Sequence, residues 1–211
     1  MAHLPTFDLE REIVGLGLDS VAGVDEAGRG PFAGPVVAAA VILDPANIPA
    51  GLADSKTLSE KRRDALAPLI RQCAEVGVGC ASVEEIDAIN ILQASLLAMR
   101  RSVAALPRAP AACLVDGNQD PKLSCRTELV VKGDARSLSI AAASIIAKTV
   151  RDKEMRELDE IHPHYGWASN KGYGSAAHRE ALKRFGATPH HRKSFAPVAA
   201  AIAAHGVIAA E

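Results

Sequence analysis

The chain has few aromatic side chains, which make up only 3% of its 211 residues. Its core must therefore be built mainly from Ala, Val, Ile and Leu, a composition that suits helices packed on a parallel or mixed sheet. Apolar residues account for 48% of the chain, which excludes disorder driven by high charge and low hydrophobicity. The length fits one α/β domain of generous size.

The sequence also lacks export and membrane signals. No basic segment followed by an apolar run opens the chain, and no run reaches the roughly 18 apolar residues of a membrane span. The four cysteines form no CxxC pair and no zinc-like group with histidine, namely Cys73, Cys80, Cys113 and Cys125. We therefore expect a soluble cytoplasmic protein with ordinary buried thiols.

The formal net charge of -1 gives no overall sign of nucleic-acid binding, so any such surface must be local. Basic residues do gather in the last third of the chain, interleaved with His178, His190 and His191: they are Lys148, Arg151, Lys171, Arg179, Lys183, Arg184, Arg192 and Lys193. Any one of them could equally be a solvated surface residue. As a group they predict a face that contacts phosphates of a duplex.

The hydrophobic pattern predicts strands followed by helices. We expect one helical turn near 9–14, and capping-box spacing at Thr57–Glu60 and Ser82–Glu85 marks two helix starts. The predicted strands are 21–26, 35–43, 76–82, 112–116 and 127–132, and the predicted helices are 58–74, 82–106, 139–161, 175–185 and 197–204. This order predicts an α/β fold with a mixed central sheet flanked by helices and a small helical C-terminal segment.

Carboxylates stand at the ends of three predicted strands. Asp25 and Glu26 close GVDE, Asp116 closes CLVDG, and Asp134 follows LVVKG. Side chains beyond strand ends can converge, and a divalent cation would compensate their burial. Oxygen ligands favour Mg²⁺ or Mn²⁺ over zinc.

The residues alone leave alternatives open for these acids. Each could be a capping or turn residue, and Asp134 also suits a helix N-terminus. Asp25 and Glu26 are neighbours, so in a regular strand their side chains face opposite sides. Both can serve one site only if the strand ends or bends there, and Gly28, Gly30 and Pro31 make such a bend plausible.

Longer motifs in the chain resemble ribonuclease HII. They are GVDEAGRGPFAG (23–34), DSKTLSEKRR (54–63), VDGN (115–118), KGDARSLSIAAASIIAKTVRD (132–152), KGYGSAAHREAL (171–182) and HHRKSFAPV (190–198). The resemblance covers about residues 20–200, which would form the catalytic domain together with its C-terminal helical substrate-binding segment. Residues 1–19 would be a lead-in and 201–211 a tail.

The resemblance implies a ribonuclease H-like fold and cleavage of RNA in RNA–DNA hybrids, including single ribonucleotides embedded in duplex DNA. It places the family's metal-binding, catalytic acids on Asp25, Glu26, Asp116 and Asp134. Phosphodiester hydrolysis by two ions, Mn²⁺ or Mg²⁺, suits four carboxylates. The expected products carry 5′-phosphate and 3′-hydroxyl ends.

The resemblance also implies a set of substrate contacts. The loop Gly28-Arg29-Gly30 would sense the 2′-hydroxyl of the scissile ribonucleotide, although a plain tight turn with a solvated Arg is the simpler reading of the residues. Tyr173 would stack on the deoxyribose beyond the ribonucleotide, or else be a structural tyrosine. The other candidate contacts are Lys56, Ser144, Lys148 and Arg192, of which Ser144 and Lys148 share a helix face.

Three rival functions remain. A non-catalytic hybrid-binding module would be favoured by loss of one of the four acids, and none is lost. A phosphatase would show a DxD pair, and a ribonuclease HIII would have a longer N-terminal region. His162 and His164 flank Pro163 with no third soft ligand, so we expect structural or surface roles.

The expected partners are RNA–DNA hybrids and ribonucleotide-containing duplex DNA. We expect no association with membranes and no obligate protein partner, and we expect the protein to be a monomer. The tail AIAAHGVIAAE has no aromatic pair for docking on a sliding clamp. The sequence leaves open the physiological metal and the preference between long hybrids and single ribonucleotides.

Overall fold

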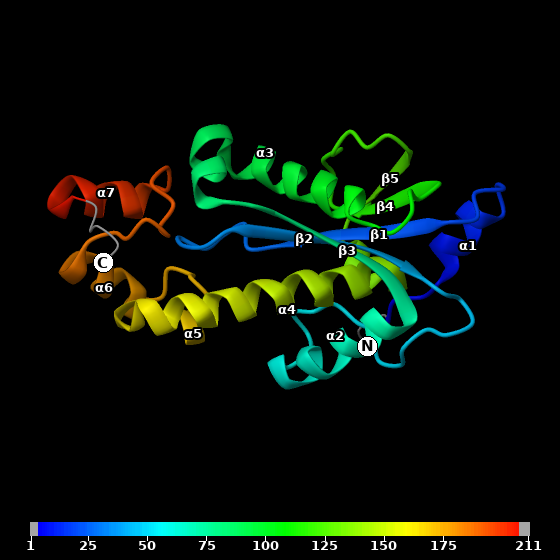
Figure 1. Cartoon of the computed structure of the whole chain (residues 1–211), viewed down its shortest axis with the longest axis horizontal. Coiled ribbons are helices and arrows are strands. Elements are labelled where there is room, and N and C mark those ends of the chain that lie inside the picture. Colours follow the sequence, from blue (N-terminus) through cyan, green and yellow to red (C-terminus); the bar gives the residue numbers. More distant parts are fainter. Residues whose placement is uncertain (1–3, 207–211) are drawn as a thin grey trace. The chain divides into compact units, whose positions relative to one another are not determined.

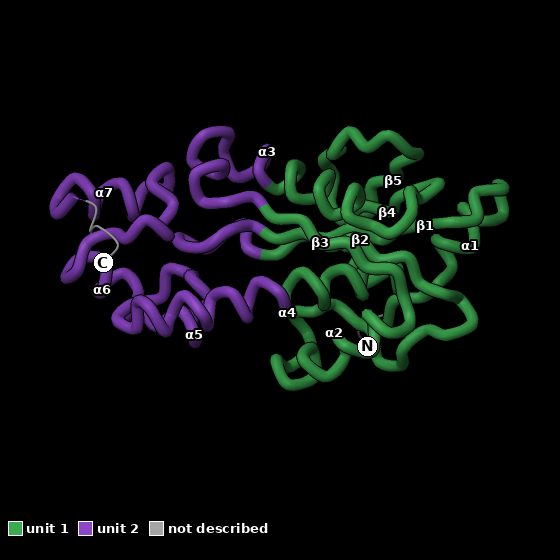
Figure 2. Tube along the Cα trace, viewed as in Figure 1, with its two compact units in different colours: residues 1–27, 37–80, 95–149 green, residues 28–36, 81–94, 150–211 purple. Residues whose placement is uncertain are grey.

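The computed structural model describes residues 4–206 (Figure 1). Contacts between residues divide the chain into two compact units (Figure 2). Among the described residues, unit 1 contains 4–27, 37–80 and 95–149, and unit 2 contains 28–36, 81–94 and 150–206. Each unit is therefore built from segments that are distant in the sequence.

A mixed five-stranded sheet has the order β3-β2-β1-β4-β5. Strands β1 and β2 are antiparallel, whereas β4 runs parallel to both β1 and β5. The strands are β1 (Val21–Ala27), β2 (Val36–Leu43), β3 (Ala74–Ala81), β4 (Ala112–Asp116) and β5 (Arg126–Val130). The predicted mixed sheet is confirmed, with strand ends shifted by one or two residues.

Helices make up the remaining regular structure (Figure 1). In unit 1, residues 95–104 lie on one side of the sheet, while 60–73 and 138–149 lie on the other (Figure 1). The helices are α1 (Asp8–Val14), α2 (Glu60–Cys73), α3 (Val83–Ala104), α4 (Leu138–Ile161), α5 (Trp167–Asn170), α6 (Ala176–Phe185) and α7 (Ala196–His205), with 3₁₀ turns η1 (Gly133–Ala135) and η2 (Pro163–Tyr165). None of these helices is both long enough and apolar enough to cross a membrane.

The two predicted capping boxes have different outcomes. At α3, Ser82 N donates to Glu85 Oε2 (2.9 Å) and Glu85 N donates to Ser82 Oγ (3.2 Å), so this box is confirmed. The box at Thr57–Glu60 was wrong, because Ser59 is the N-cap of α2 and accepts from Arg62 N. Thr57 instead donates to the Asp54 carbonyl (2.7 Å) in the preceding turn.

Helix α3 is interrupted, although we predicted it as continuous. Asn90 has φ 68° and ψ 163°, and its Oδ1 accepts from Leu92 N and Gln93 N. Asparagine tolerates positive φ, and its side chain caps the helix that restarts after it. The helical residues 83–94 and 95–104 belong to different units.

The sheet and α4 approach each other closely at Gly23. A Cβ on Gly23 would lie 2.1 Å from the Ser139 carbonyl carbon, so no other residue fits without moving the helix. Buried residues around it are small or branched, including Val24, Ile140 and Ala143. The core of unit 1 is thus aliphatic, as the composition predicted.

Unit 2 uses most of the few large aromatic residues. Its core cluster contains Tyr165 and Trp167, with Phe32, Phe185 and Phe195 packed against it. Tyr165 and Trp167 stack with ring centroids 5.1 Å apart, and Tyr165 Oη donates to the Gly186 carbonyl (2.9 Å). The short elements η2 and α5, which the sequence pattern did not predict, carry these two rings.

Candidate active site

Asp25 and Glu26 lie near the end of the central strand β1. The strand does not end or bend at these two acids, because both still pair in register with β2; the first positive φ after them is at Gly28 (99°), one of the residues expected to turn the chain. Asp25 is 4% exposed, and its Oδ1 accepts from Glu26 N (2.7 Å). Burial, followed by the charges of Glu26 and Asp116, raises the pKa of Asp25 well above its usual value.

Asp116 ends the neighbouring parallel strand β4. Because Val24 pairs with Val115, the next residues, Asp25 and Asp116, come at the same level of the sheet. Asp116 Oδ1 accepts from Gly133 N (2.6 Å), which ties the end of β4 to the 3₁₀ turn η1. The sequence-predicted strand end is therefore also an anchor for the segment that carries the next acid.

Asp134 lies on η1 and is 5% exposed. Lys132 precedes this turn with φ 55°, a left-handed conformation that redirects the chain after β5. Burial, then the charges of Asp54 and Asp116, raise the pKa of Asp134, while Lys56 acts in the opposite direction. The turn thus brings Asp134 into the electrostatic field of the other acids.

Asp54 is an acid of this site that we did not predict as a site residue. Its carboxylate is near enough to Asp134 to raise the pKa of that acid, and its Oδ1 accepts from Lys56 N (2.8 Å). The signal was present, because Asp54 opens the DSK motif that contains Lys56. The motif alone does not identify Asp54 as a fifth carboxylate of the site.

Lys56 forms an ion pair with one of these acids. Its Nζ lies 3.5 Å from Asp134 Oδ2, and its side chain is otherwise exposed. Burial opposes its charge, but the carboxylates of Asp134, Asp25 and Asp54 outweigh it and raise the pKa of Lys56. An exposed ammonium that stays charged and lies beside these carboxylates is well placed to bind a phosphate group.

The donor set suits a hard divalent cation. Asp25 and Asp134 are buried carboxylates, and the negative charges around each make it harder to ionise, a cost that a bound cation removes. Within residues 4–206, no three His, Cys, Asp or Glu side chains already stand at metal-ligand spacing. The carboxylate oxygens are therefore suitable ligands for a divalent cation. The acids do not already surround one point at metal-ligand distances.

Ser144 and Lys148 lie on α4 in unit 1. Ser144 is buried, and its Oγ donates to Ser55 Oγ (2.6 Å), which links α4 to the DSK segment. Lys148 is half-buried on the same helix face. These two candidate contacts therefore belong to the same unit as the four acids and Lys56.

The other substrate-contact candidates belong to unit 2. Phe32 N donates to the Gly172 carbonyl (2.8 Å), which joins the loop after β1 to the KGYG segment. A Cβ on Gly30 would lie 3.3 Å from Tyr173 Cε1, so the loop and this half-exposed ring are neighbours. Arg29 and Gly30 are exposed.

Arg192 is not at the surface. It is 0% exposed, and its guanidinium donates to backbone carbonyls of 28–35. Arg151 and Lys171 are also buried, so three of the eight residues in the predicted basic face do not contribute exposed charge. Arg179, Lys183, Arg184 and Lys193 are exposed, as predicted.

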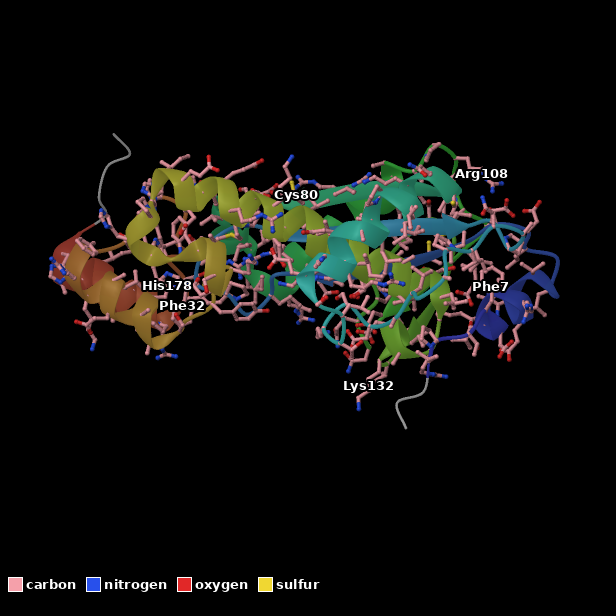
Figure 3. The ribbon with its side chains drawn as sticks, turned by 90° about the horizontal axis from the view of Figure 1, so that it is seen from below. Phe7, Phe32, Cys80, Arg108, Lys132 and His178 are labelled. Atoms are coloured by element: carbon pink, nitrogen blue, oxygen red, sulfur yellow. The ribbon has the colours of Figure 1, made fainter. Side chains whose placement is uncertain are left out.

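His178 and His191 form a buried pair in unit 2, with Phe32 beside His178 (Figure 3). His178 Nδ1 lies 2.9 Å from the Tyr173 carbonyl and must donate, so its Nε2 is an acceptor for Trp167 Nε1 (3.2 Å). His191 Nδ1 accepts from Thr188 N (3.0 Å), so its proton is on Nε2, 3.0 Å from His178 Nε2. In this arrangement both rings are neutral, and burial lowers the pKa of each.

His162 and His164 take structural positions, as expected. His162 meets the Trp167 ring edge-on at 5.7 Å, and His164 stacks on Phe185 at 4.7 Å. The cysteines differ from expectation in one respect. All four are free thiols, but only Cys113 is buried and Cys80 is exposed (Figure 3).

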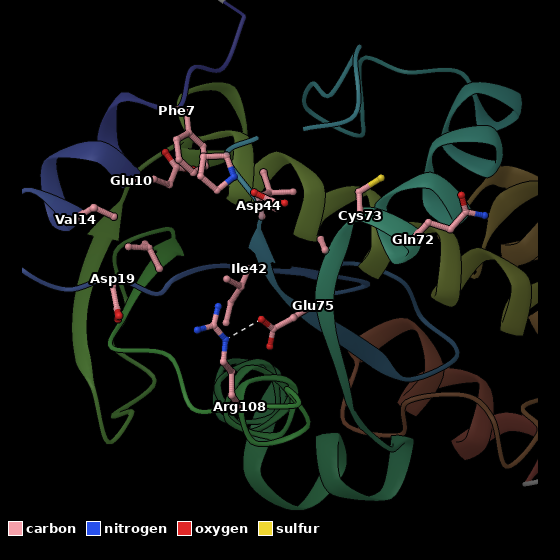
Figure 4. Close-up of a pocket in the computed structure, with 14 residues that line it drawn as sticks. Phe7, Glu10, Val14, Asp19, Ile42, Asp44, Gln72, Cys73, Glu75 and Arg108 are labelled. Atoms are coloured by element: carbon pink, nitrogen blue, oxygen red, sulfur yellow. Dashed lines mark hydrogen bonds and ion pairs between the residues drawn. The ribbon is translucent and has the colours of Figure 1, made fainter. Parts of the chain in front are cut away.

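A separate cavity of about 440 Å³ lies in unit 1 (Figure 4). Its lining includes Glu10, Asp19 and Asp44, and Arg108 Nε donates to Glu75 (2.7 Å) there. None of the site residues predicted from the sequence lines this cavity.

Comparison with known proteins identifies the relatives of the chain. The family model described as ribonuclease HII matches residues 22–198. A protein named ribonuclease HII from Jannaschia sp. (strain CCS1) is 59% identical over 196 residues, which cover 92% of this chain and 96% of that protein.

Solved structures show the same fold. Ribonuclease H2 from Pyrococcus horikoshii superposes with a TM-score of 0.72 at 29% identity, covering 86% of this chain and 96% of that one. Ribonuclease HII of Archaeoglobus fulgidus, solved as a complex with PCNA, gives a TM-score of 0.64 at 32% identity and covers 78% and 86%. The predicted fold class is confirmed.

Proposed function

The chain belongs to the ribonuclease HII family and is a metal-dependent endoribonuclease acting on RNA–DNA hybrids, and we propose that it also cuts duplex DNA on the 5′ side of single embedded ribonucleotides. The observation that carries this proposal is the set of acids at neighbouring strand ends. Asp25 and Asp116 come level on parallel strands, and the charges of Glu26, Asp116 and Asp134 all raise the pKa of Asp25.

The four acids Asp25, Glu26, Asp116 and Asp134 are proposed to hold the metal. Two Mg²⁺ or Mn²⁺ ions, when bound, supply the positive charge that activates water and stabilises the leaving 3′ oxygen. Asp116 is kept in place by the Gly133 amide, and Asp134 by the 3₁₀ turn η1, in which it lies. The products would carry 5′-phosphate and 3′-hydroxyl ends.

Lys56 is proposed to contact the substrate phosphate. Its exposed ammonium is retained near Asp134 by attraction to several carboxylates, so it can contact a phosphate without leaving the acids. Ser144 would act by holding the DSK segment through Ser55, and Lys148 would add positive charge from α4.

In unit 2, the loop Gly28-Arg29-Gly30 is proposed to sense the 2′-hydroxyl and Tyr173 to stack on the next deoxyribose. Support comes from the contact between Gly30 and the Tyr173 ring and from the exposure of both. The exposed basic residues of α6, such as Arg179 and Lys183, would contact phosphates without reading sequence.

We further propose a cytoplasmic monomer with no obligate protein partner. Cys113 and Cys125 are free thiols: the Cys125 thiol donates a hydrogen bond to Cys113 Sγ (3.6 Å), an arrangement that suits a reducing compartment. The Archaeoglobus relative was solved with PCNA, whereas the tail of this chain lacks an aromatic pair for such docking. That expectation stays a prediction, because residues 207–211 lie outside the described part of the chain.

The test uses a labelled DNA duplex with one ribonucleotide and the same duplex without it. We expect one cut, 5′ of the ribonucleotide, with Mn²⁺ or Mg²⁺ and none with EDTA. Tight binding without cutting under every metal condition would instead favour a non-catalytic hybrid-binding module. Cutting of the all-DNA duplex would contradict the proposed specificity.

A further inference from the structure

Two buried arginines lie beneath the loop after β1. Arg151 and Arg192 are 1% and 0% exposed, and both belong to unit 2 together with residues 28–36. Burial lowers the pKa of Arg192 to about 9, and the nearby charge of Arg151 adds to this effect. Two buried like charges are costly, so the contacts they make must offset a large desolvation penalty.

The donors of both guanidiniums go to backbone carbonyls. Arg151 donates through Nε to Pro35 O (3.0 Å), through Nη2 to Ala33 O (3.0 Å) and through Nη1 to Lys171 O (2.9 Å). Its side chain also fills the space where Gly28 would carry a Cβ, only 2.0 Å from Arg151 Nε. Arg151 therefore supports the later part of the loop and requires glycine at its start.

Arg192 supports the part of the loop that faces the substrate in the proposed function. Its Nη2 donates to Gly28 O (2.5 Å), its Nη1 to Arg29 O (3.0 Å) and its Nε to Gly34 O (2.9 Å). In a planar trans peptide, a carbonyl and the following N–H point in opposite directions. Carbonyls of Gly28 and Arg29 that face Arg192 therefore direct the N–H groups of Arg29 and Gly30 away from it.

We propose that Arg192 is a positioning residue that sets two adjacent amide donors, Arg29 N–H and Gly30 N–H, for recognition of the ribose 2′-hydroxyl. This inference rests on the proposed function, because it takes the Gly28–Gly30 loop as the sensor. The residue after Gly30 is Pro31, which has no N–H, so the pair of donors ends there. Arg192 acts through the loop and does not itself contact the substrate.

Arg151 provides a matched control, because it is equally buried and bonds the same segment without contacting the Gly28 or Arg29 carbonyl. A merely structural role predicts equal effects of Arg192→Lys and Arg151→Lys. Positioning predicts that only Arg192→Lys, which keeps the charge but loses the fork of donors, impairs the choice between ribose and deoxyribose.

The experiment measures affinity for a duplex with one ribonucleotide and for the all-DNA duplex of the same sequence, in an Asp134→Asn background that prevents cutting. We expect Arg192→Lys to lower the ratio of the two affinities about tenfold, the scale of one lost hydrogen bond of 1.4 kcal/mol. Arg151→Lys should change this ratio less than about threefold at a similar loss of thermal stability.

Equal ratios for the two variants would overturn the inference. If the protein with both arginines intact binds the two duplexes with nearly equal affinity, the proposed function is refuted, and the inference that rests on it fails as well. If Arg192→Lys does not fold, NMR of the Asp134→Asn chain with Arg192 intact decides the question. The Arg29 and Gly30 amide signals should respond differently to the two duplexes, and identical responses would refute the proposal.

Discussion

Acidification should destabilise the protein through His191. The ring is fully buried, its Nδ1 accepts from Thr188 N, and its Nε2 donates to His178 Nε2. An added proton on Nδ1 would displace the bond from Thr188 N and would have only the Thr188 hydroxyl oxygen, also 3.0 Å away, as an acceptor. Burial, followed by the charges of His178 and His162, lowers the pKa of His191 from 6.5 to about 3.

The direction of the effect follows from proton uptake. Between these two pKa values the unfolded chain binds a proton at His191 and the folded chain does not, so the free energy of unfolding falls as the pH decreases. Above the unfolded pKa of 6.5, His191 is neutral in both states and does not change the free energy of unfolding with pH. At pH 5 the loss is about 2 kcal/mol, and it approaches about 5 kcal/mol below pH 3.

Urea unfolding at pH 7.5 and pH 5.0, followed by circular dichroism in EDTA, measures this loss. Because carboxylates also titrate, the informative quantity is the difference between wild type and His191→Gln. We expect the wild-type decrease in unfolding free energy to exceed that of the variant by about 2 kcal/mol. His164→Gln, at an exposed position, is the control and should behave as wild type. An equal pH dependence in wild type and His191→Gln would refute the argument.

Three further predictions concern the site and its support. Asp134→Asn removes charge without volume, so cleavage should be abolished while the unfolding curve is kept; turnover at ordinary metal concentration would contradict this. Tyr173→Ala should reduce single-ribonucleotide cleavage at least about tenfold but change stability by less than about 1 kcal/mol, because the ring is 49% exposed. A loss of thermal stability with unchanged specific activity would show that the ring is structural. Gly23→Ala should cost about 3 kcal/mol in urea unfolding, because its Cβ would overlap Ser139, and a smaller loss would mean that α4 can move away.

The strands and the acids could be predicted because their signals are local. An apolar run such as 36–43 can only be a buried strand in this context, and Asp25, Asp116 and Asp134 stand directly after such runs or one turn later. The break at Asn90 could not be predicted, since asparagine is tolerated within helices and only its φ of 68° reveals the cap.

The contacts of the buried arginines could not be predicted from the sequence. Arginine ordinarily signals surface charge, and the carbonyl that accepts from Arg192 Nη2 lies 164 residues away in the chain. Asp54 was missed for a related reason. Its neighbours in the sequence suggest a turn, whereas its contact with Asp134 exists only once the chain has folded.

The central place of β1 in the sheet has a consequence for local opening. Its backbone pairs with β2 on one side and β4 on the other, and Ala22 and Val24 are completely buried. Amide hydrogen exchange at such positions requires nearly global unfolding. We therefore expect slow exchange on the strands that carry Asp25 and Asp116, and their spacing should persist through the partial openings that surface loops undergo.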